Sequence, residues 1–273
     1  MIHPTAIIDP AAKIDPTVNI GPYCAIEGPV QIGPDCVLHS HVKLIGPLQM
    51  GAKNVMHSFA VLGDIPQDVK FHEGNSRLII GDSNVFREHV TVHRGTEGET
   101  VIGSNCYLMV GAHVGHNCRL GNNITMVNAA VLAGHVQIAD RAIIGGLCAV
   151  HQYCRIGRLV MISNNSAHNV DIPPFVMSLN TNSITQLNNV GLRRSGMSHK
   201  SINALRLMFK ILFREHGDLP LNKAIEILPN DLKEVPEVAE FIAFVQSTKR
   251  GIARYVPWSE QLGRKSGSDG EEE

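Results

Sequence analysis

Residues 102–120 read IGSNCYLMVGAHVGHNCRL, and every sixth residue of this stretch, beginning with Ile102, is aliphatic. The same period of six runs without a slip through residues 8–62, and after two interruptions it continues to Ile162. A short repeat that is sustained over most of a chain predicts a solenoid, and a period of six residues predicts a parallel β-helix.

Three periods of six make one triangular coil, so residues that are 18 apart stack on each other about 4.8 Å apart in neighbouring coils. Two segments interrupt the repeat. Residues 63–79 are polar and lack the period, and residues 94–101 make one period four residues too long. We expect the first segment to project from the coils as a loop. Loops on a rigid scaffold are where binding residues usually lie.

The composition fits this fold and limits the function. The 273 residues are 44% hydrophobic but only 5% aromatic, as expected where each corner of a coil takes one aliphatic side chain. The net charge of −1 argues against a nucleic-acid partner. The chain has no apolar run long enough to span a membrane and no signal-peptide core at its start, so we expect a cytoplasmic protein without a transmembrane segment.

All six cysteines stand four residues after an aliphatic residue of the repeat, in a slot where a small side chain is preferred. A buried thiol in that slot acts as a compact hydrophobic group. No Cys-x-x-Cys pair is present, which argues against a zinc or redox centre. We therefore expect reduced, structural cysteines.

The periodicity changes near the C-terminus. The repeat fades after Ser166, and the two prolines at 173 and 174 are expected to close it. Apolar residues at helical spacing predict helices after the N-cap residue Ser198, over 221–228 and over 235–245. The predicted divisions are a β-helix over 1–190, a helical C-terminal domain over 191–260 and a disordered acidic tail over 261–273.

Four of the fourteen histidines fall together when the coils are stacked. With the second interruption removed, they lie on four adjacent coils within two lateral positions of one another; they are His93, His116, His135 and His151. His113 lies near the preceding corner. One histidine in an exposed slot needs no function, but four on one face predict a functional cluster. Neutral imidazoles suit a general base near neutral pH, and they equally suit a metal.

The residues around the cluster favour acyl transfer. Gly134 directly precedes His135 and stacks on His116 by the 18-residue rule. A glycine leaves its backbone N–H open to a reacting carbonyl, as an oxyanion donor requires. No serine or cysteine nucleophile is placed beside His116, so we expect direct attack by an acceptor substrate, with a histidine as the base.

Six short motifs, taken in this order along nearly the whole chain, resemble the UDP-N-acetylglucosamine O-acyltransferase family. They are VHRGT at 92–96, GHNC at 115–118, LAGHV at 132–136, IGG at 144–146, AVHQYC at 149–154 and DIPP at 171–174. The resemblance implies an all-β, left-handed parallel β-helix with a small α-helical C-terminal domain. It also implies a homotrimer whose active sites lie between neighbouring subunits.

The resemblance further implies the reaction. The family moves an (R)-3-hydroxyacyl group from acyl carrier protein to the glucosamine 3-hydroxyl of UDP-N-acetylglucosamine, the first step of lipid A biosynthesis. No cofactor or metal is implied beyond the phosphopantetheine that carries the acyl group. Carried onto this chain, the family pattern makes His116 the general base and Gly134 the oxyanion donor. The positions that match substrate contacts are Gln67, Asp68, Lys70, His93, Arg94, His113, His135, His151, Asn188 and Arg194.

Two positions depart from the family pattern. The family usually has aspartate after the catalytic histidine, where this chain has Asn117, so an amine acceptor such as a 3-amino sugar nucleotide stays open. Asn164 stands in a turn that is glycine-rich in members that accept longer chains. A side chain there predicts a shorter groove and an acyl group of medium length, about ten carbons, since pocket depth sets the discrimination between chains.

Two other classes of protein compete with this interpretation. A γ-type carbonic anhydrase is also a trimer of β-helices and binds zinc through three histidines, two of them five residues apart. The close pair here, His113 and His116, is three apart, and the long C-terminal domain is surplus to such an enzyme. A non-enzymatic β-helix scaffold is the second alternative, and measured turnover would exclude it.

Overall fold

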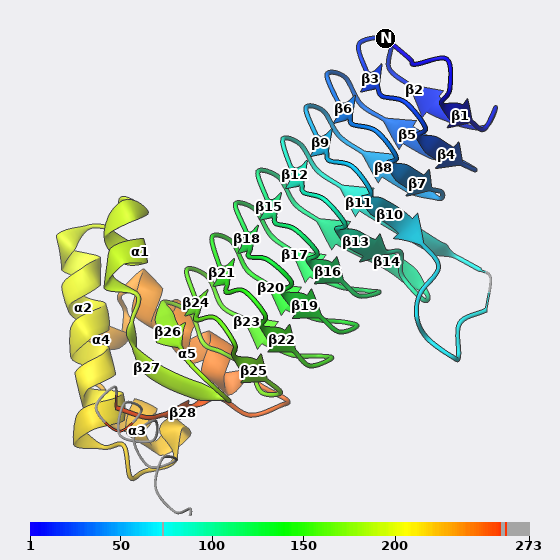
Figure 1. Ribbon diagram of the computed structural model, residues 1–273. Coiled ribbons are helices and arrows are strands. Elements are labelled where there is room, and N and C mark those ends of the chain that lie inside the picture. The colour runs from blue at the N-terminus through cyan, green and yellow to red at the C-terminus, as the bar shows by residue number, and fades with distance from the viewer. Residues whose placement is uncertain (73, 258–259, 261–273) are drawn as a thin grey trace, which may run out of the picture.

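The computed structural model describes residues 1–72, 74–257 and 260. Within them the chain winds into a long prism of stacked coils that carries helices at its C-terminal end (Figure 1). Each coil contributes one short strand to each of three sheets, and neighbouring coils pair in parallel along the prism. The predicted parallel β-helix with a helical C-terminal part is confirmed.

Up to β25 the strands pair only between coils, and each sheet takes every third strand of the prism. Sheet 1 contains β1 (Ile7–Ile8), β4 (Ala25–Glu27), β7 (Lys43–Ile45), β10 (Val61–Asp64), β13 (Thr91–His93), β16 (His113–Val114), β19 (Val131–Leu132), β22 (Ala149–Val150) and β25 (Ala167–His168). Sheet 2 contains β2 (Lys13–Ile14), β5 (Val30–Ile32), β8 (Leu48–Met50), β11 (Ser76–Ile80), β14 (Gly98–Ile102), β17 (Arg119–Leu120), β20 (Gln137–Ile138) and β23 (Arg155–Ile156). Sheet 3 contains β3 (Asn19–Ile20), β6 (Val37–Leu38), β9 (Val55–Met56), β12 (Val85–Phe86), β15 (Tyr107–Leu108), β18 (Thr125–Met126), β21 (Ile143–Ile144), β24 (Met161–Ile162), β26 (Val176–Ser178), β27 (Ser183–Leu187) and β28 (Arg254–Tyr255).

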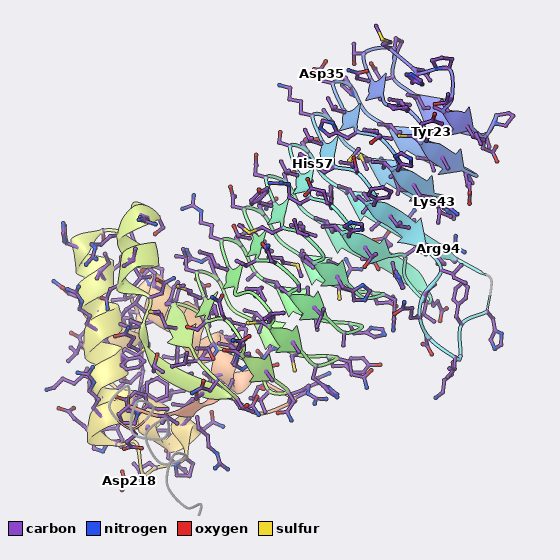
Figure 2. All side chains as sticks on the ribbon, in the orientation of Figure 1. Tyr23, Asp35, Lys43, His57, Arg94 and Asp218 are labelled. Carbon is purple, nitrogen blue, oxygen red and sulfur yellow. The ribbon has the colours of Figure 1, made fainter. Side chains whose placement is uncertain are left out.

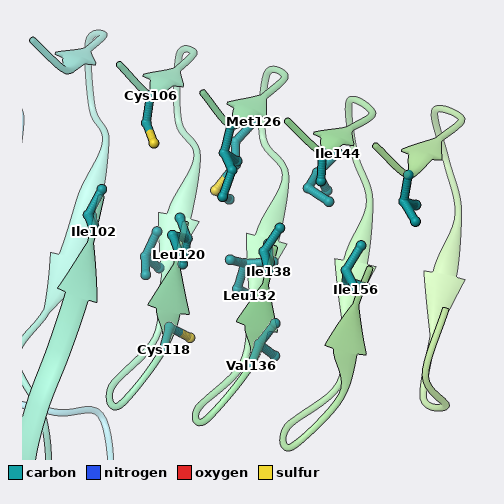
Figure 3. Close-up of a cluster of buried hydrophobic side chains, with 14 of the residues drawn as sticks. Ile102, Cys106, Cys118, Leu120, Met126, Leu132, Val136, Ile138, Ile144 and Ile156 are labelled. Carbon is teal, nitrogen blue, oxygen red and sulfur yellow. The ribbon is translucent and has the colours of Figure 1, made fainter. Parts of the chain in front are cut away.

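The register between coils follows the 18-residue rule. Val114 pairs with Leu132, and Leu132 pairs with Val150. Val92 pairs with Val114 once the inserted residues are skipped, as predicted. The aliphatic residues of the repeat point into the prism from all three sheets, where they stack on one another (Figure 3). All six cysteines are free and buried in the same core.

The two interruptions lie in neighbouring coils at the corner between sheets 1 and 2. The first projects from the prism between β10 and β11 (Figure 1), as predicted, but its last residues do not belong to the loop. They form β11, which pairs over its whole length with the equally long β14 that ends the second interruption. Two insertions in adjacent coils can pair with each other, and a search for the six-residue period alone does not detect this.

The prolines at 173 and 174 do not end the sheet. After them, β26 pairs in parallel with β24, and β27 then turns back antiparallel to β26. Proline lacks a backbone donor and has a fixed φ, but it does not prevent the following residues from forming a strand, and β26 begins two residues after Pro174. The prediction that these prolines close the repeat was therefore wrong, because one more parallel strand, β26, follows them.

The helical part contains short helices joined by tight turns. They are α1 (Asn189–Arg194), α2 (His199–Lys210), the π-helix η1 (Ile211–Glu215), α3 (Leu221–Ile227), α4 (Asn230–Lys233) and α5 (Pro236–Gln246). Ser198 caps α2 as predicted, because its hydroxyl accepts from the N–H of Ser201 at 3.0 Å. The sequence did not predict α1, η1 or α4. The predicted acidic tail, 261–273, lies outside the described residues, and the domain divisions stay a prediction.

Two arginines attach the helices to the last coils. Arg158 forms a forked ion pair with Glu240 of α5, with its shortest contact at 2.6 Å. Arg155 donates to Asp171 Oδ2 at 2.8 Å and to the carbonyl of Phe244 at 3.0 Å. Forked charge-assisted hydrogen bonds fix geometry as well as adding stability. The helical part is therefore held rigidly at the C-terminal end of the prism.

One core position carries a histidine in place of an aliphatic residue. His168 pairs in register with Val150, and only 2% of its surface is exposed. Its Nδ1 has no hydrogen-bond partner within the described part of the chain. Burial lowers the pKa of His168 to about 4, because a charged imidazole is poorly solvated there.

We expect His168→Val to remove much of the acid sensitivity of the fold. An unfolded histidine has a pKa of about 6.5, so wild-type stability falls as the pH drops from about 6.5 towards 4, by up to roughly 3 kcal/mol. Urea unfolding of both proteins at pH 7.5 and at pH 5 measures this difference. The same change at the exposed His3 should leave the pH dependence intact. Equal slopes for wild type and His168→Val would contradict the prediction.

Candidate active site

The predicted histidine cluster forms at the corner where β16, β19 and β22 leave sheet 1. The rings of His93 and His113 meet edge to face with centroids 5.1 Å apart. The rings of His116 and His135 do the same at 5.3 Å. The structure therefore brings four of the predicted imidazoles into contact, through registers that the six-residue period had fixed.

Two hydrogen bonds define the protonation of His116. Its Nδ1 lies 2.9 Å from Thr96 Oγ1 and 3.0 Å from Asn117 Oδ1. The amide orientation of Asn117 is fixed, because its Oδ1 also accepts from the N–H of Thr96 while its Nδ2 donates to the carbonyl of Glu97 at 2.7 Å. An amide oxygen can only accept, so we assign the proton to Nδ1. The Nε2 lone pair of His116 is then available to accept a proton.

The hydrogen bond from Asn117 Nδ2 to the carbonyl of Glu97 explains why asparagine can stand at position 117. An aspartate would hold the imidazole equally well, but it has no donor for the carbonyl of Glu97. The oxygen and the nitrogen of the Asn117 side-chain amide together therefore hold the turn that carries Thr96 against the turn that carries His116. The departure from the family pattern has a local structural reason, and it does not by itself indicate an amine acceptor.

We expect Asn117→Asp to lower kcat/KM by at least about tenfold, because it sets a carboxylate oxygen against the Glu97 carbonyl and leaves that carbonyl without a donor. The new charge should also stabilise protonated His116 and shift the acid limb of the pH–rate profile to higher pH. A pH series of kcat/KM measures both effects. Asn105→Asp is the control, since Asn105 has the same left-handed backbone, with φ of 59°, outside the cluster. An unchanged profile would contradict the assignment.

Gly134 lies against the Nε2 end of the His116 ring. A Cβ atom at this position would stand 2.5 Å from both Cε1 and Nε2 of His116. Any other residue would therefore displace the imidazole, so the glycine is required by this close approach. The predicted stacking of Gly134 on His116 is confirmed.

The backbone N–H of Gly134 is buried but donates to no group in the part of the chain that the structure describes. At several other corners a side chain from a neighbouring coil caps the N–H in this slot of the repeat. Gly146 donates to Asn164 Oδ1 at 2.8 Å, and Asn122 donates to Asp140 Oδ1 at 2.7 Å. Unpaired buried N–H groups are rare in folded proteins. Gly134 therefore offers an open donor beside the free Nε2 of His116.

The same comparison gives Asn164 a structural role. Its carbonyl oxygen caps the N–H of Gly146 at the corner between sheets 3 and 1. Its part in setting acyl-chain length stays a prediction.

Burial favours the neutral form of three other histidines at this corner, His93, His113 and His135. Burial lowers the pKa of His113 to about 4, and its neighbours His93 and His116 add to the shift. Burial is also the main cause that lowers the pKa values of His93 and His135, against the opposing carboxylates of Asp64 and Asp68 respectively. Neutral imidazoles do not repel a positive charge that forms on His116 during a reaction.

The projecting loop is anchored to the cluster. The N–H of Gln67 donates to His93 Nδ1 at 3.2 Å, and Asp68 Oδ1 accepts from the N–H of Lys70 at 2.9 Å. Arg94 lies buried at the base of the loop (Figure 2), where it donates to the carbonyl of Gly46 at 2.7 Å. These contacts place the predicted loop residues near the histidines and make Arg94 an anchor of the scaffold.

Asn188 and Arg194 are not brought to the cluster within one chain. Asn188 is the N-cap of α1 and Arg194 is its last residue, and α1 lies beside β24 on the side of the prism opposite the projecting loop (Figure 1). Asn188 is buried, accepts from the N–H of Gly191 and donates to the carbonyl of Leu159. Arg194 is exposed. Their predicted role therefore requires a neighbouring subunit.

Two residues of the site were not predicted. Tyr153 stacks on His135 with centroids 4.6 Å apart. It stands 18 residues after His135, so the coil register contained the signal. Thr96 lies in a recognised motif, but its contact with His116 depends on the irregular path of the second interruption, which has no period to follow.

Two cavities flank the corner. An apolar trough of about 470 Å³ runs along the outer face of sheet 1 over His113, Val131, Ala133, Ala149, His151 and Ala167. A charged groove of about 770 Å³ runs along sheet 2 towards the helices, over Asn117, Arg119, His135, Tyr153, Lys249 and Arg250 among others. Among the described residues no group of three or more histidines, cysteines or carboxylates is arranged to hold a metal ion, and no helix is long and apolar enough to cross a membrane.

Comparisons with known proteins agree on one enzyme. Residues 171–253 match the family described as UDP-N-acetylglucosamine O-acyltransferase, domain 2. An acyl-[acyl-carrier-protein]--UDP-N-acetylglucosamine O-acyltransferase from Thermodesulfovibrio yellowstonii is 42% identical over 257 residues, which are 93% of this chain and 99% of the relative. The protein of the same name from Anaeromyxobacter is 41% identical with the same coverage.

Solved structures of UDP-N-acetylglucosamine acyltransferases superpose on nearly the whole of this chain. The UDP-N-acetylglucosamine acyltransferase of Francisella novicida superposes with a TM-score of 0.89 at 32% identity, and the match covers 100% of both chains. The enzyme of the same name from Campylobacter jejuni superposes with a TM-score of 0.87 at 35% identity, covering 94% of this chain and 100% of that one.

Proposed function

The chain belongs to the acyl-[acyl-carrier-protein]--UDP-N-acetylglucosamine O-acyltransferase family, and we propose that it transfers an (R)-3-hydroxyacyl group from acyl carrier protein to the 3-hydroxyl of UDP-N-acetylglucosamine. This reaction is the first step of lipid A biosynthesis. The observation that carries the proposal is the pair formed by His116 and Gly134. A free imidazole nitrogen and an open buried N–H lie side by side, as direct acyl transfer requires.

The mechanism follows from this geometry. His116 Nε2 takes the proton of the sugar hydroxyl as the hydroxyl oxygen attacks the thioester carbonyl carbon. The negative charge that forms on the carbonyl oxygen is held by the N–H of Gly134. The tetrahedral intermediate then expels the pantetheine sulfur, which takes the proton from His116 and leaves as a thiol. Thr96 and Asn117 hold the ring throughout.

The apolar trough suits the acyl tail. It begins at His113, close to the reacting centre, and its floor is made of small side chains such as Ala149 and Ala167. A hydrocarbon chain laid along it buries apolar surface on both partners. We propose a medium chain, with Asn164 beyond the trough as the predicted limit to its length.

We propose a homotrimer with shared active sites. The outward residues of sheet 3 are largely apolar and include Val37, Val55, Val85, Ile143 and Met161. Those of sheet 1 are similar, whereas the outward column of sheet 2 includes Lys13, Gln31, Gln49, Arg119, Gln137 and Arg155. Two apolar faces and one polar face suit a closed ring of copies. In such a ring, Asn188 and Arg194 of one subunit would contact the nucleotide that is bound at the histidine cluster of the next subunit.

The proposed reaction needs no metal or separate cofactor, because the donor arrives already activated as a thioester. We also propose that it takes place in the cytoplasm. The six free, buried cysteines are compatible with a reducing compartment.

The test is product mass after mixing the purified protein with UDP-N-acetylglucosamine and a ladder of (R)-3-hydroxyacyl carrier proteins. A sugar nucleotide that carries one acyl group would support the proposal, and the best donor would give the chain length. Absence of product with every donor, followed by acylation of a 3-amino sugar nucleotide, would overturn the hydroxyl acceptor in favour of an amine. Absence of product with either acceptor would favour the alternative that the protein is a non-enzymatic scaffold.

A further inference from the structure

A second group of stacked rings lies outside the active site, at the corner where sheet 3 meets sheet 1. One column of rings crosses four successive coils through Tyr23, His41, Phe59 and His89, with successive centroids 5.1, 5.0 and 5.2 Å apart. We call these four residues the ring column. All four are exposed, and Tyr23 keeps 61% of its surface open to solvent.

The backbone of the ring column is unusual for such large side chains. All four residues have positive φ, between 57° and 66°. Asparagine and glycine are favoured in this region, and bulky side chains are rare there. The next two coils carry small residues at the equivalent position, Gly111 and Ala129. An outlier of this kind, repeated on four coils, points to a functional surface.

A second column flanks the same corner. The rings of His39 and His57 stack with centroids 4.7 Å apart, and Arg87 takes the same position on the next coil. We call these three residues the basic column. Arg87 is held by Glu88 at 3.1 Å and by the hydroxyl of Tyr107 at 2.9 Å. The basic column directly follows strands of sheet 3, whereas the ring column stands two residues before strands of sheet 1.

The proposed trimer brings this corner to its centre. A three-fold ring joins two different faces at each contact, so sheet 1 of one copy faces sheet 3 of the next. The corner that these two sheets share then points to the axis. Three triangular corners fill only about half of the turn around an axis, so the faces diverge outwards and the copies are closest at the corner. Exposed apolar side chains continue along it at Val110 and Leu147.

The two columns are placed to meet each other. Rotation about the axis does not shift the copies along it, so equal coils lie at equal heights. The ring column borders sheet 1 and the basic column borders sheet 3 on the same coils, so the ring column of one copy faces the basic column of the next. An arginine over an aromatic face gains a cation–π attraction, which Arg87 can make with Phe59 of its neighbour.

We propose that this corner is the seam of the trimer, where the ring column of each copy packs on the basic column of the next, and that acid opens the seam. This inference rests on the proposed trimer and deepens it. It assigns closure of the ring to residues in the N-terminal coils, away from the histidine cluster of the active site. The occupant of the exposed corner is thus a second copy of the same chain.

The charges at the corner explain why acid should open it. Each copy brings four histidines, so the closed ring holds twelve imidazoles around its axis. Glu88 is the only carboxylate among the corner residues of these four coils, and Arg87 and His57 already engage it. On the adjoining strands of sheet 1, Lys43 is paired with Glu27 at 3.0 Å. No free carboxylate in this part of the described chain is left to balance added protons.

Protonation therefore favours separated copies. Burial is the main cause that lowers the pKa of His57, and the neighbouring His39 adds to the shift while Glu88 opposes it. Closing the ring removes more water from the imidazoles and adds the charges of two further copies. Separated copies thus bind protons more readily than the trimer does. Assembly must then weaken as the pH falls.

The first test places a cation in the seam. In Phe59→Lys we expect the mass by analytical ultracentrifugation at pH 7.5 to fall from that of three chains to that of one, because three like charges join a seam rich in cations. Asn105→Lys is the matched control. Asn105 is exposed and has the same left-handed backbone, with φ of 59°, but it lies at the corner between sheets 2 and 3. This control should remain a trimer.

The second test removes charge from the seam and keeps its rings. We expect wild type to be a trimer at pH 7.5 and a single chain at a pH of about 5.5, where exposed imidazoles are protonated. The double variant His41→Phe/His89→Phe should dissociate only at a lower pH than wild type. His199→Phe, which changes an exposed residue of α2, should dissociate at the same pH as wild type.

The other outcomes separate the possible failures. A trimeric Phe59→Lys, or an Asn105→Lys that also dissociates, would overturn the seam. A wild type that stays a trimer at the lower pH, or a double variant that dissociates together with it, would overturn the opening by acid. A wild type that is a single chain at pH 7.5 would overturn the trimer itself. A trimer without product would instead overturn the proposed acyl transfer and leave the seam in place.

Discussion

Replacing His116 with alanine is expected to lower kcat by about a thousandfold, within the range that general-base catalysis supplies. The Nε2 of this imidazole lies beside Gly134 and is free to accept a proton, because Thr96 and Asn117 occupy Nδ1. The KM for the sugar nucleotide should change only a few-fold, since the loss falls on the transition state and not on binding. Steady-state kinetics with one acyl carrier protein donor measures both constants.

The control for this prediction is another histidine. His199→Ala changes an exposed residue at the start of α2, far from the cluster in the prism (Figure 1), and should leave kcat unchanged. Free imidazole in the assay should restore part of the activity of His116→Ala by filling the space of the lost ring. A His116→Ala enzyme that keeps a tenth of its kcat would show that another group is the base.

The site could be predicted from the sequence wherever the coil register determines it. The 18-residue rule places Gly134 on His116, and the structure confirms that contact. It also implies that Tyr153 stacks on His135, although only the structure made this evident. Residues on regular coils are predictable because each coil repeats the geometry of the one before it.

Contacts from irregular segments could not be predicted in this way. The hydrogen bond from Asn117 to the carbonyl of Glu97 depends on the path of the second interruption, which follows no period. The pairing of β11 with β14 is of the same kind, because two insertions fit each other and neither shows it alone. The short helix α1 and the π-helix η1 arise from packing that propensity does not encode.

Replacing Gly134 with alanine is expected to lower kcat by about a hundredfold, although the backbone N–H is retained. The new methyl group would stand 2.5 Å from Nε2 and Cε1 of His116, so the ring must move away from the attacking hydroxyl. A displacement of about 1 Å at a reacting centre is enough for a loss of this size. The same Michaelis–Menten measurements give the constants, and KM should change little.

The fold itself should tolerate this change, which separates the effect from unfolding. The atoms that the methyl group meets belong to a side chain that can swing outward, not to the backbone of the next coil. Gly146→Ala is the matched control, because Gly146 fills the same slot of the repeat and its added methyl would meet nothing closer than 3.3 Å. Equal melting temperatures with a hundredfold difference in kcat would support the geometry. A Gly134→Ala enzyme as active as Gly146→Ala would show that His116 does not need its close approach to this glycine, and the paired role of the two residues would fail.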